Sequence, residues 1–387
     1  MNQPGRAWEA LLSRGAGAFT SPSFALFVEL LCAWVCATGR RSLCGMVAVM
    51  GPATRRAHDA YHRLVRAGKW DLGALWATMV AAVAEHLGPQ GKVVVLVDDT
   101  LFHRGGRKVE GAGSYRDAVR STHKRVVYAR GLCLVVLAIR LGPPRGGMPI
   151  AIPVGVALHR KGGPKLPELA RGLMAELAGR LPGRDFVLCC DGAYAGLAGK
   201  GLPRTIVVSR MRRDAALYGP PPPRSGTRGR PRCRGERLPT PAVLARGASK
   251  WVTVEVPWRG RSTTRQVWSR PVLWYRVSPK AMVLLVVVRD PEGKEPDDYF
   301  FTTDLSMTPG DVLSLYGDRW AIVMWSSGVS CAWLSRRERP LRRRGVSCGT
   351  VVRCARSSAP ARRRCRVREV GCVRAGRWSR WVRSAEE

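Results

Sequence analysis

Two short apolar runs that end in aspartate constrain the fold of this chain more than any other feature. Val93–Val97 leads directly into two aspartates, and Phe186–Cys190 leads into a third. Continuous apolar runs of this length are typical of buried strands in sheets that helices cover on both faces. We therefore expect an α/β domain within residues 91–210.

The segments between and beside these runs favour the same architecture. Leu132–Ile139 and Ile150–Leu158 are two more apolar, β-branched runs with a Gly/Pro turn between them, and Ile206–Ser209 is a further short strand. One face of a predicted helix is marked by four leucines at helical spacing: Leu166, Leu169, Leu173 and Leu177. Strands followed by a helix, a strand and a helix indicate an α/β layer arrangement.

The segment before this domain, within residues 1–88, is expected to form a small helical domain. Phe24–Cys36 is apolar except for Glu29 and is too short to cross a bilayer about 30 Å thick as a helix, so we predict a buried helix. Because nothing near residue 1 resembles an apolar signal segment, we expect a cytoplasmic protein with reduced thiols and no membrane partner.

A basic helical stretch follows in the same domain. Arg55 and Arg56 are candidate DNA contacts, although a solvated basic helix face explains them equally well. His58 and His62 are four residues apart, but no further ligand stands in register with them. The sequence therefore gives no reason to expect a metal at this pair.

Residues 211–307 change to Pro/Gly-rich and β character, which predicts a β-rich insertion into the α/β domain. Its expected strands are WVTVEV, VLWYRV, MVLLVVV and YFFTT. A basic loop precedes them, and three of its arginines are candidates for minor-groove contacts with DNA, namely Arg228, Arg230 and Arg232. A flexible linker is the alternative interpretation of that loop.

The charge of the chain indicates what it binds. Its 65 Lys and Arg against 28 Asp and Glu leave a formal net charge of +37. An excess of this size is expected where the partner is a polyanion, and double-stranded DNA is the obvious one.

The aspartates that follow the apolar runs are candidate metal ligands. Adjacent parallel strands place their carboxyl ends side by side, so Asp191 is expected to lie near Asp98 and Asp99. Mg²⁺, or Mn²⁺ in its place, takes such oxygen ligands, and two ions can support a phosphodiester displacement. Strand alternation allows only one of the first pair to face the site; we prefer Asp99, which precedes Thr100, with Asp98 as the alternative. Helix-cap or turn roles are the simpler interpretation of each site alone.

A third signal is the helix predicted over residues 309–322. Thr308 is a suitable N-cap, and Asp311 three residues later resembles a capping box. Tyr316, Arg319 and position 323 are spaced to share one face of this helix.

At this point the chain resembles the DDE transposases of bacterial insertion sequences, over about residues 25–322. The resemblance rests on VDDT, CDGAY and YGDRW in this order, the last being part of a Tyr-x2-Arg-x3-Glu-x6-Lys motif. It implies an RNase H-like catalytic domain interrupted by a β-rich insertion, with Mg²⁺ at Asp99 and Asp191. It further implies that Tyr316 and Arg319 contact DNA, and that the chain cuts transposon ends and transfers the strands, as a possible homodimer associated with the nucleoid.

The chain departs from this motif at its end. Val323 stands where the motif has Glu, and Ser330 where it has Lys. Residues 323–387 contain 17 Arg and 4 Glu but no Lys, Asp, Asn, Gln, His, Ile, Phe or Tyr, and show no hydrophobic period. We interpret residues 308–322 as a remnant of the catalytic helix and the tail as an out-of-frame, disordered or non-native extension, with a native basic tail as the alternative.

The sequence thus predicts five segments, at residues 1–88, 89–210, 211–307, 308–322 and 323–387. It predicts a transposase that binds DNA but cuts it poorly, because a third acidic ligand is missing. A basic DNA-binding protein without catalytic activity is the competing hypothesis.

Overall fold

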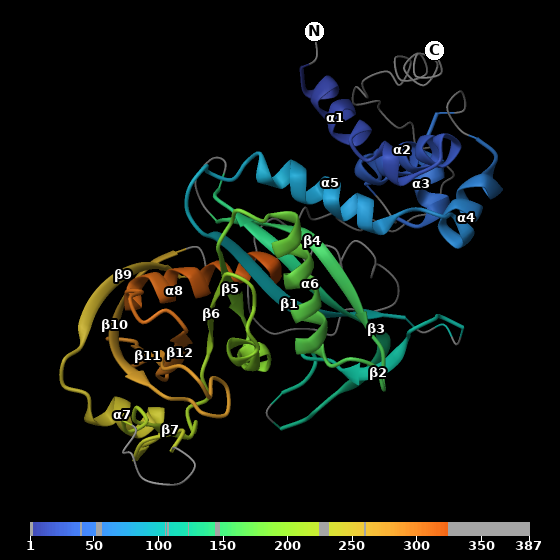
Figure 1. The fold of residues 1–387 in the computed structure, drawn as a ribbon. Helices are drawn as coiled ribbons and strands as arrows, with labels where there is room; N and C mark the ends of the chain where they lie inside the picture. The colour runs from blue at the N-terminus through green and yellow to red at the C-terminus, as the bar shows by residue number, and fades with distance from the viewer. Residues whose placement is uncertain are drawn as a thin grey trace, which may run out of the picture. The chain divides into compact units, whose positions relative to one another are not determined.

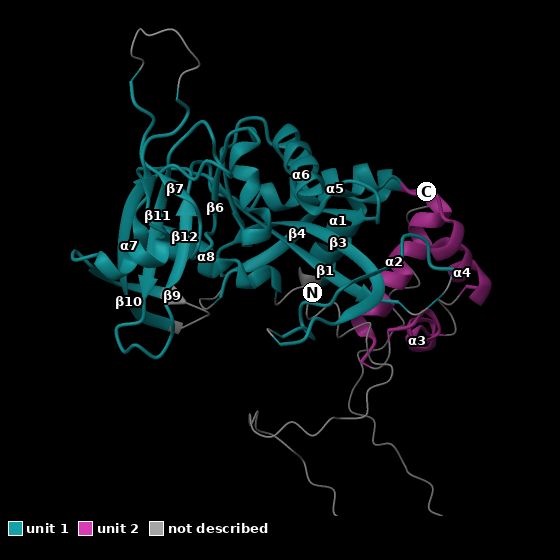
Figure 2. Cartoon of the chain, turned by 90° about the horizontal axis from the view of Figure 1, so that it is seen from below, with its two compact units in different colours: residues 1–18, 71–330 teal, residues 19–70, 331–387 magenta. Residues whose placement is uncertain are grey.

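The computed structural model describes residues 3–38, 41–51, 56–104, 106, 108–122, 124–143, 148–223, 232–258 and 261–323. They belong to two compact units, shown in teal and magenta in Figure 2. Residues 19–70 form the described part of the helical unit. The described residues before 19 and after 70 form the sheet unit. The predicted tail beyond Val323 and the loop arginines Arg228 and Arg230 lie outside the described residues, as does Arg55.

The helical unit is built from α2 (Ser21–Cys36), α3 (Leu43–Val49) and α4 (His58–Ala67). Six buried apolar side chains form its core: Leu30, Ala33, Met46, Val47, Tyr61 and Leu64. The helix predicted over Phe24–Cys36 is confirmed. Glu29 is tolerated in it because its carboxylate accepts hydrogen bonds from the Tyr61 hydroxyl at 2.6 Å and from Arg56 Nε at 3.0 Å.

This unit is smaller than the segment expected from the sequence. α1 (Gln3–Ser13) and α5 (Leu72–Ala84) belong to the sheet unit instead. Val80 and Val83 of α5 are buried in the core of that unit, which explains the division. Among the helices that the structure describes, we find none with the length and apolar character needed to cross a bilayer.

The sheet unit contains one ten-stranded sheet in the order β2-β3-β1-β5-β6-β12-β11-β10-β9, with β4 paired to β3 (Figure 1). Its strands are β1 (Val93–His103), β2 (Gly113–Arg116), β3 (Tyr128–Leu141), β4 (Ile150–His159), β5 (Phe186–Cys190), β6 (Thr205–Arg210), β9 (Val252–Trp258), β10 (Arg261–Val272), β11 (Val283–Arg289) and β12 (Asp298–Thr302). A separate pair joins β7 (Leu217–Tyr218) to β8 (Arg237–Leu238).

The centre of this sheet confirms the predicted α/β class. β1, β3 and β4 form an antiparallel meander. On the other side of β1, β5 pairs parallel to β1, and β6 pairs parallel to β5. This is the RNase H-like arrangement that the resemblance implies. The strands of the insertion do not form a separate layer, because β12 pairs with β6 and the sheet simply continues.

Each face of the sheet is covered by helices. α6 (Leu166–Arg180) packs with the odd-numbered residues of β1 on one face, together with η2 (Gly192–Gly199). α8 (Pro309–Asp318) packs on the opposite face, over Leu96 of β1 and the odd-numbered residues of β5. α7 (Pro241–Gly247) and η1 (Ala16–Ala18) are short additions.

Two strand predictions are corrected by the structure. β1 does not end before its aspartates: it continues to His103, because β3 supplies backbone partners from Ile139 to Gly131. VLWYRV is not a strand. β10 ends at Val272, and Trp274 begins a turn in which its carbonyl accepts from the amides of Val277 and Ser278. The preceding polar stretch forms the strand instead, since β9 and β11 pair with it on both sides.

The centre of the sheet is expected to be the most sensitive part of the fold. Leu188 on β5 is 0% exposed, so Leu188→Ala leaves a cavity and should lower the free energy of unfolding by about 3 kcal/mol. Leu305→Ala makes the same change at a side chain that is 48% exposed and is the matched control. Denaturant unfolding of both variants measures the difference; equal losses would contradict the assigned core.

Candidate active site

The parallel pairing of β1 with β5 brings the candidate carboxylates together. The last paired residues are Val97 and Cys190, so Asp98 and Asp191 follow at neighbouring positions of the two strands. Asp191 is the N-cap residue of η2, and its carboxylate accepts a hydrogen bond from the backbone amide of Gly192. The expected convergence of distant aspartates thus results from strand register.

Strand alternation assigns Asp98 to the face that α8 covers. Leu96, two residues earlier on β1, lies in the core beneath α8, and so do the odd-numbered residues of β5 that precede Asp191. Asp98 accepts a hydrogen bond from Arg319 Nη1 at 2.9 Å, and Arg319 directly follows α8. Asp98 and Asp191 therefore share the face on which the predicted third motif lies.

Asp99 points to the opposite face of the sheet. Its neighbours in alternation, Val95 and Val97, lie in the core beneath α6. Its carboxylate accepts a hydrogen bond from the Tyr194 hydroxyl at 3.1 Å, and Tyr194 is fully buried in η2. Burial, together with the charge of Asp99 and this hydrogen bond, holds the pKa of Tyr194 well above its usual range. Tyr194 is the last residue of CDGAY, but nothing in the sequence indicated which aspartate it contacts.

The electrostatics of the site favour a positively charged ligand. Burial raises the pKa of Asp98 from 3.8 to about 6, against the opposing effect of Arg319, and the charges of Asp99 and Asp191 raise it further. Burial also raises the pKa of Asp99, and the hydrogen bond from Tyr194 opposes that shift. The charges of Asp99 and Asp191 thus disfavour the ionised form of Asp98, and a bound cation would relieve that repulsion.

The residues of the third motif are less accessible than expected. Tyr316 is 3% exposed and its ring centroid lies 4.6 Å from that of Phe300, with the rings tilted; Arg319 is 9% exposed. In this arrangement Arg319 compensates the charge of Asp98 rather than facing solvent. Their role as DNA contacts stays a prediction.

Position 323, where the resemblance implies the third carboxylate, does not supply one. Val323 is half-buried and packs against the core beneath α8. Asp318 is the nearest acidic residue of that helix, but it forms an ion pair with Arg140 at 2.8 Å. Arg140 adjoins the Val95–Ile139 pair, toward the other end of β1 from Asp98. The position expected to hold Glu is therefore apolar.

The remaining predicted DNA contacts are located only in part. Arg56 belongs to the helical unit and is ion-paired with Glu29 at 3.0 Å. Arg232 is exposed in the sheet unit, at the end of the predicted basic loop. The roles of Arg56 and Arg232 as DNA contacts stay predictions.

Comparison with known protein families shows which family this chain belongs to. A family model described as DDE superfamily endonuclease matches residues 21–280, which is more than half of the chain. The chain belongs to the DDE superfamily endonucleases. A search of curated proteins finds no match.

Membership in this endonuclease family establishes the broad chemistry. Such enzymes act on DNA and generally use divalent metal ions. The matched region contains Asp98, Asp99 and Asp191 but ends before α8. The match therefore covers the three aspartates but does not reach Tyr316 or Val323.

Burial of Asp98 has a cost for stability that depends on pH. Because the pKa of Asp98 is raised in the folded chain, its ionised form is destabilising above about pH 6, and the penalty disappears below the unfolded value of 3.8. Without divalent ions, Asp98→Asn should therefore raise the free energy of unfolding by about 1–3 kcal/mol at pH 8. Denaturant unfolding at pH 8 and pH 4 measures this gain, which should be absent at pH 4; a gain of equal size at both values would contradict it.

Proposed function

We propose that this chain is a transposase whose site for DNA strand cleavage is formed by Asp98 and Asp191. The observation that carries the proposal is their placement at neighbouring positions, Asp98 within β1 and Asp191 directly after β5, on the face covered by α8, with Arg319 donating to Asp98. The substrate would be the double-stranded DNA at transposon ends, within the nucleoid, with two copies of the chain holding two ends.

The donor set fits a hard divalent cation. Both proposed ligands are carboxylates, and Mg²⁺ or Mn²⁺ prefers oxygen ligands completed by substrate phosphates. Burial raises the pKa of Asp98 above all, and Arg319 offsets the cost of its buried charge only in part. When bound, such an ion would activate the attacking oxygen and stabilise the leaving oxygen of a phosphodiester.

Two residues of the chain would hold the β1 aspartates in position at this site. Asp98 and Asp191 hold the negative charge on one face, and Tyr194 holds Asp99 on the other face by a hydrogen bond. Arg319 keeps Asp98 in place from the α8 side. Because Val323 brings no carboxylate, we propose that DNA binding is retained while strand cleavage is severely impaired.

Arg210 is the best-placed cation for a phosphate contact near these carboxylates. It follows Ser209, the partner of Cys190, so strand register puts it next to Asp191. Its side chain is 47% exposed and is shared between an ion pair with Asp298 and the Phe300 ring. A half-exposed guanidinium beside the proposed metal site can contact a DNA phosphate without a rearrangement of the site.

Arg210→Ala should weaken binding of duplex DNA several-fold and reduce the salt dependence of log K by about one. Arg180→Ala removes the same charge from the end of α6, over the opposite face, and is the control. Fluorescence anisotropy at several salt concentrations measures the affinity and its salt dependence for both variants. The probe is a labelled duplex that carries the DNA flanking this gene. Equal effects of the two substitutions would show that Arg210 has no special place on the DNA.

Cleavage of the same labelled duplex in Mg²⁺ tests the proposed function. We expect tight, salt-sensitive binding with little or no nicking, and weaker Mg²⁺ binding after Asp98→Ala or Asp191→Ala. The apolar Val323 also favours a second candidate, a DNA-binding protein without a metal site. That candidate is correct if neither substitution changes Mg²⁺ binding, and nicking at the rate of an intact transposase would contradict the proposed impairment.

A further inference from the structure

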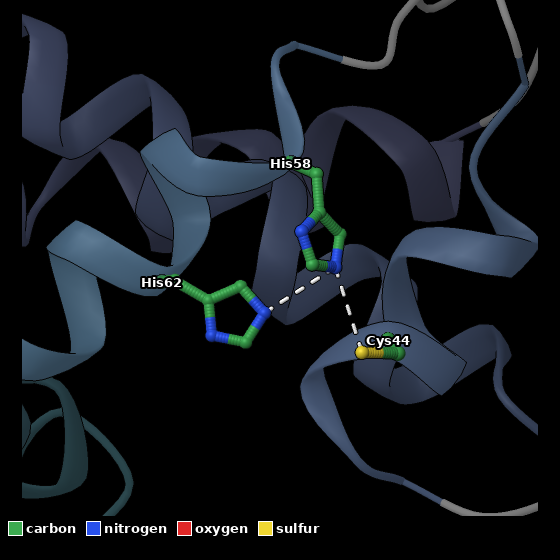
Figure 3. A group of neighbouring side chains, drawn as sticks. All are labelled: Cys44, His58 and His62. Carbon is green, nitrogen blue, oxygen red and sulfur yellow. Dashed lines mark hydrogen bonds between the residues drawn. The ribbon is translucent and has the colours of Figure 1, made fainter.

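A cluster of side chains that can bind a metal lies in the helical unit. His58 and His62 occupy successive turns of α4, and Cys44 lies in the first turn of α3 (Figure 3). Their donor atoms all lie within 4.8 Å of one another, and all three residues are exposed. We propose that Cys44, His58 and His62 bind Zn²⁺ or a similar transition-metal ion.

The separations between donor atoms suit a tetrahedral ion. The Nε2 atoms of the two histidines are 3.3 Å apart, and Cys44 Sγ is 3.5 Å from His58 Nε2. Zinc bonds of about 2.0–2.1 Å to nitrogen and about 2.3 Å to sulfur give donor separations of about 3.3–3.6 Å at tetrahedral angles. The two separations from His58 Nε2 fall in that range, and the donor atoms of Cys44 and His62 lie within 4.8 Å of each other.

Hydrogen bonding alone accounts poorly for this arrangement. Nε2 of His58 faces both Nε2 of His62 and Sγ of Cys44, as the dashed lines in Figure 3 show. A neutral imidazole nitrogen carries either one proton or one lone pair, so it forms a single linear hydrogen bond at most. An ion at the centre would take a lone pair from all three donors at once.

The size of the helical unit gives such an ion a structural effect. Six buried apolar residues form the core of this unit, and domains this small commonly rely on a metal or disulfide for stability. Cys44 lies on α3 and the histidines on α4, so a shared ion would link two helices whose connection passes through residues 51–57. We therefore expect binding to raise the thermal stability of this unit.

The donor chemistry separates this site from the carboxylates. One thiolate and two imidazoles suit zinc and related first-row ions, whereas Mg²⁺ prefers oxygen ligands. With three protein donors among the described residues, the fourth position is open to water or another exchangeable ligand. The sequence did not indicate Cys44 as a ligand, because Cys44 lies on a different helix from His58 and His62.

Cobalt titration of the full-length chain tests the proposal, since Co²⁺ reports thiolate ligation by its charge-transfer absorption. Wild type should bind one equivalent more than Cys44→Ser or His62→Ala, and both variants should lose the matching charge-transfer increment. Cys36→Ser changes an exposed cysteine of the same unit and is the control. Comparison with this control is needed because the chain has 12 cysteines. Equal stoichiometry in Cys44→Ser and Cys36→Ser would overturn the proposal.

A second measurement uses only the wild-type chain, so it does not depend on how a variant folds. Zn²⁺ should slow alkylation of Cys44 by iodoacetamide at least tenfold, as measured by peptide mass spectrometry, and should leave Cys36 unaffected. Mg²⁺ should protect neither thiol. Equal alkylation of Cys44 with and without Zn²⁺ would contradict metal binding even if the variants failed to fold.

Discussion

Asp191→Asn and Asp98→Asn should each weaken Mn²⁺ or Mg²⁺ binding at least about 100-fold, because each removes the charge of one of two proposed ligands. Both carboxylates lie on the α8 face, Asp98 within β1 and Asp191 directly after the neighbouring strand β5. Isothermal titration with Mg²⁺ and electron paramagnetic resonance with Mn²⁺ measure the effect, in the presence of duplex DNA whose phosphates complete the coordination.

Asp99→Asn is the matched control for this prediction. It makes the same change one residue along the same strand, but Asp99 points to the α6 face and is held by Tyr194. We expect its effect on ion binding to stay within about threefold, the residual influence of a nearby charge. A larger loss for Asp99→Asn than for Asp98→Asn would restore the sequence-based preference for Asp99 and contradict the assignment by strand face.

Val323→Glu is expected to increase Mg²⁺-dependent nicking of transposon-end DNA by about 100-fold, which is the cost of misplacing a catalytic group by about 1 Å. Position 323 is one helical turn beyond Arg319, which contacts Asp98, so a carboxylate there can join the same site. The nicked fraction of a labelled duplex over time measures the gain.

Val323→Gln separates the charge from the change in shape. It has nearly the volume of Glu and the same hydrogen-bonding reach but no negative charge, so we expect no gain in nicking. Circular dichroism of both variants checks that burying a polar side chain at this half-buried position leaves the fold intact. Equal activity of the Glu and Gln variants would show that position 323 does not contribute to metal binding in this chain.

Much of the architecture follows from local patterns in the sequence. Phe186–Cys190 forms the predicted strand, and Thr308 accepts the predicted capping hydrogen bond from the amide of Asp311. These features were predictable because an apolar run or a cap depends on residues a few positions apart. The polar strand Arg261–Val272 was not, since β9 and β11 supply its hydrogen bonds from elsewhere in the chain.

By itself, the sequence determined the α/β class, the edge of the sheet at which Asp191 meets the β1 aspartates, and the loss of an acidic residue at Val323. Only the tertiary structure decided that Asp98 rather than Asp99 faces α8, and that Cys44 joins His58 and His62. The reason is physical: alternation along a strand separates two faces, but which face a distant helix covers depends on packing between elements. The same holds for donor atoms that meet across two helices.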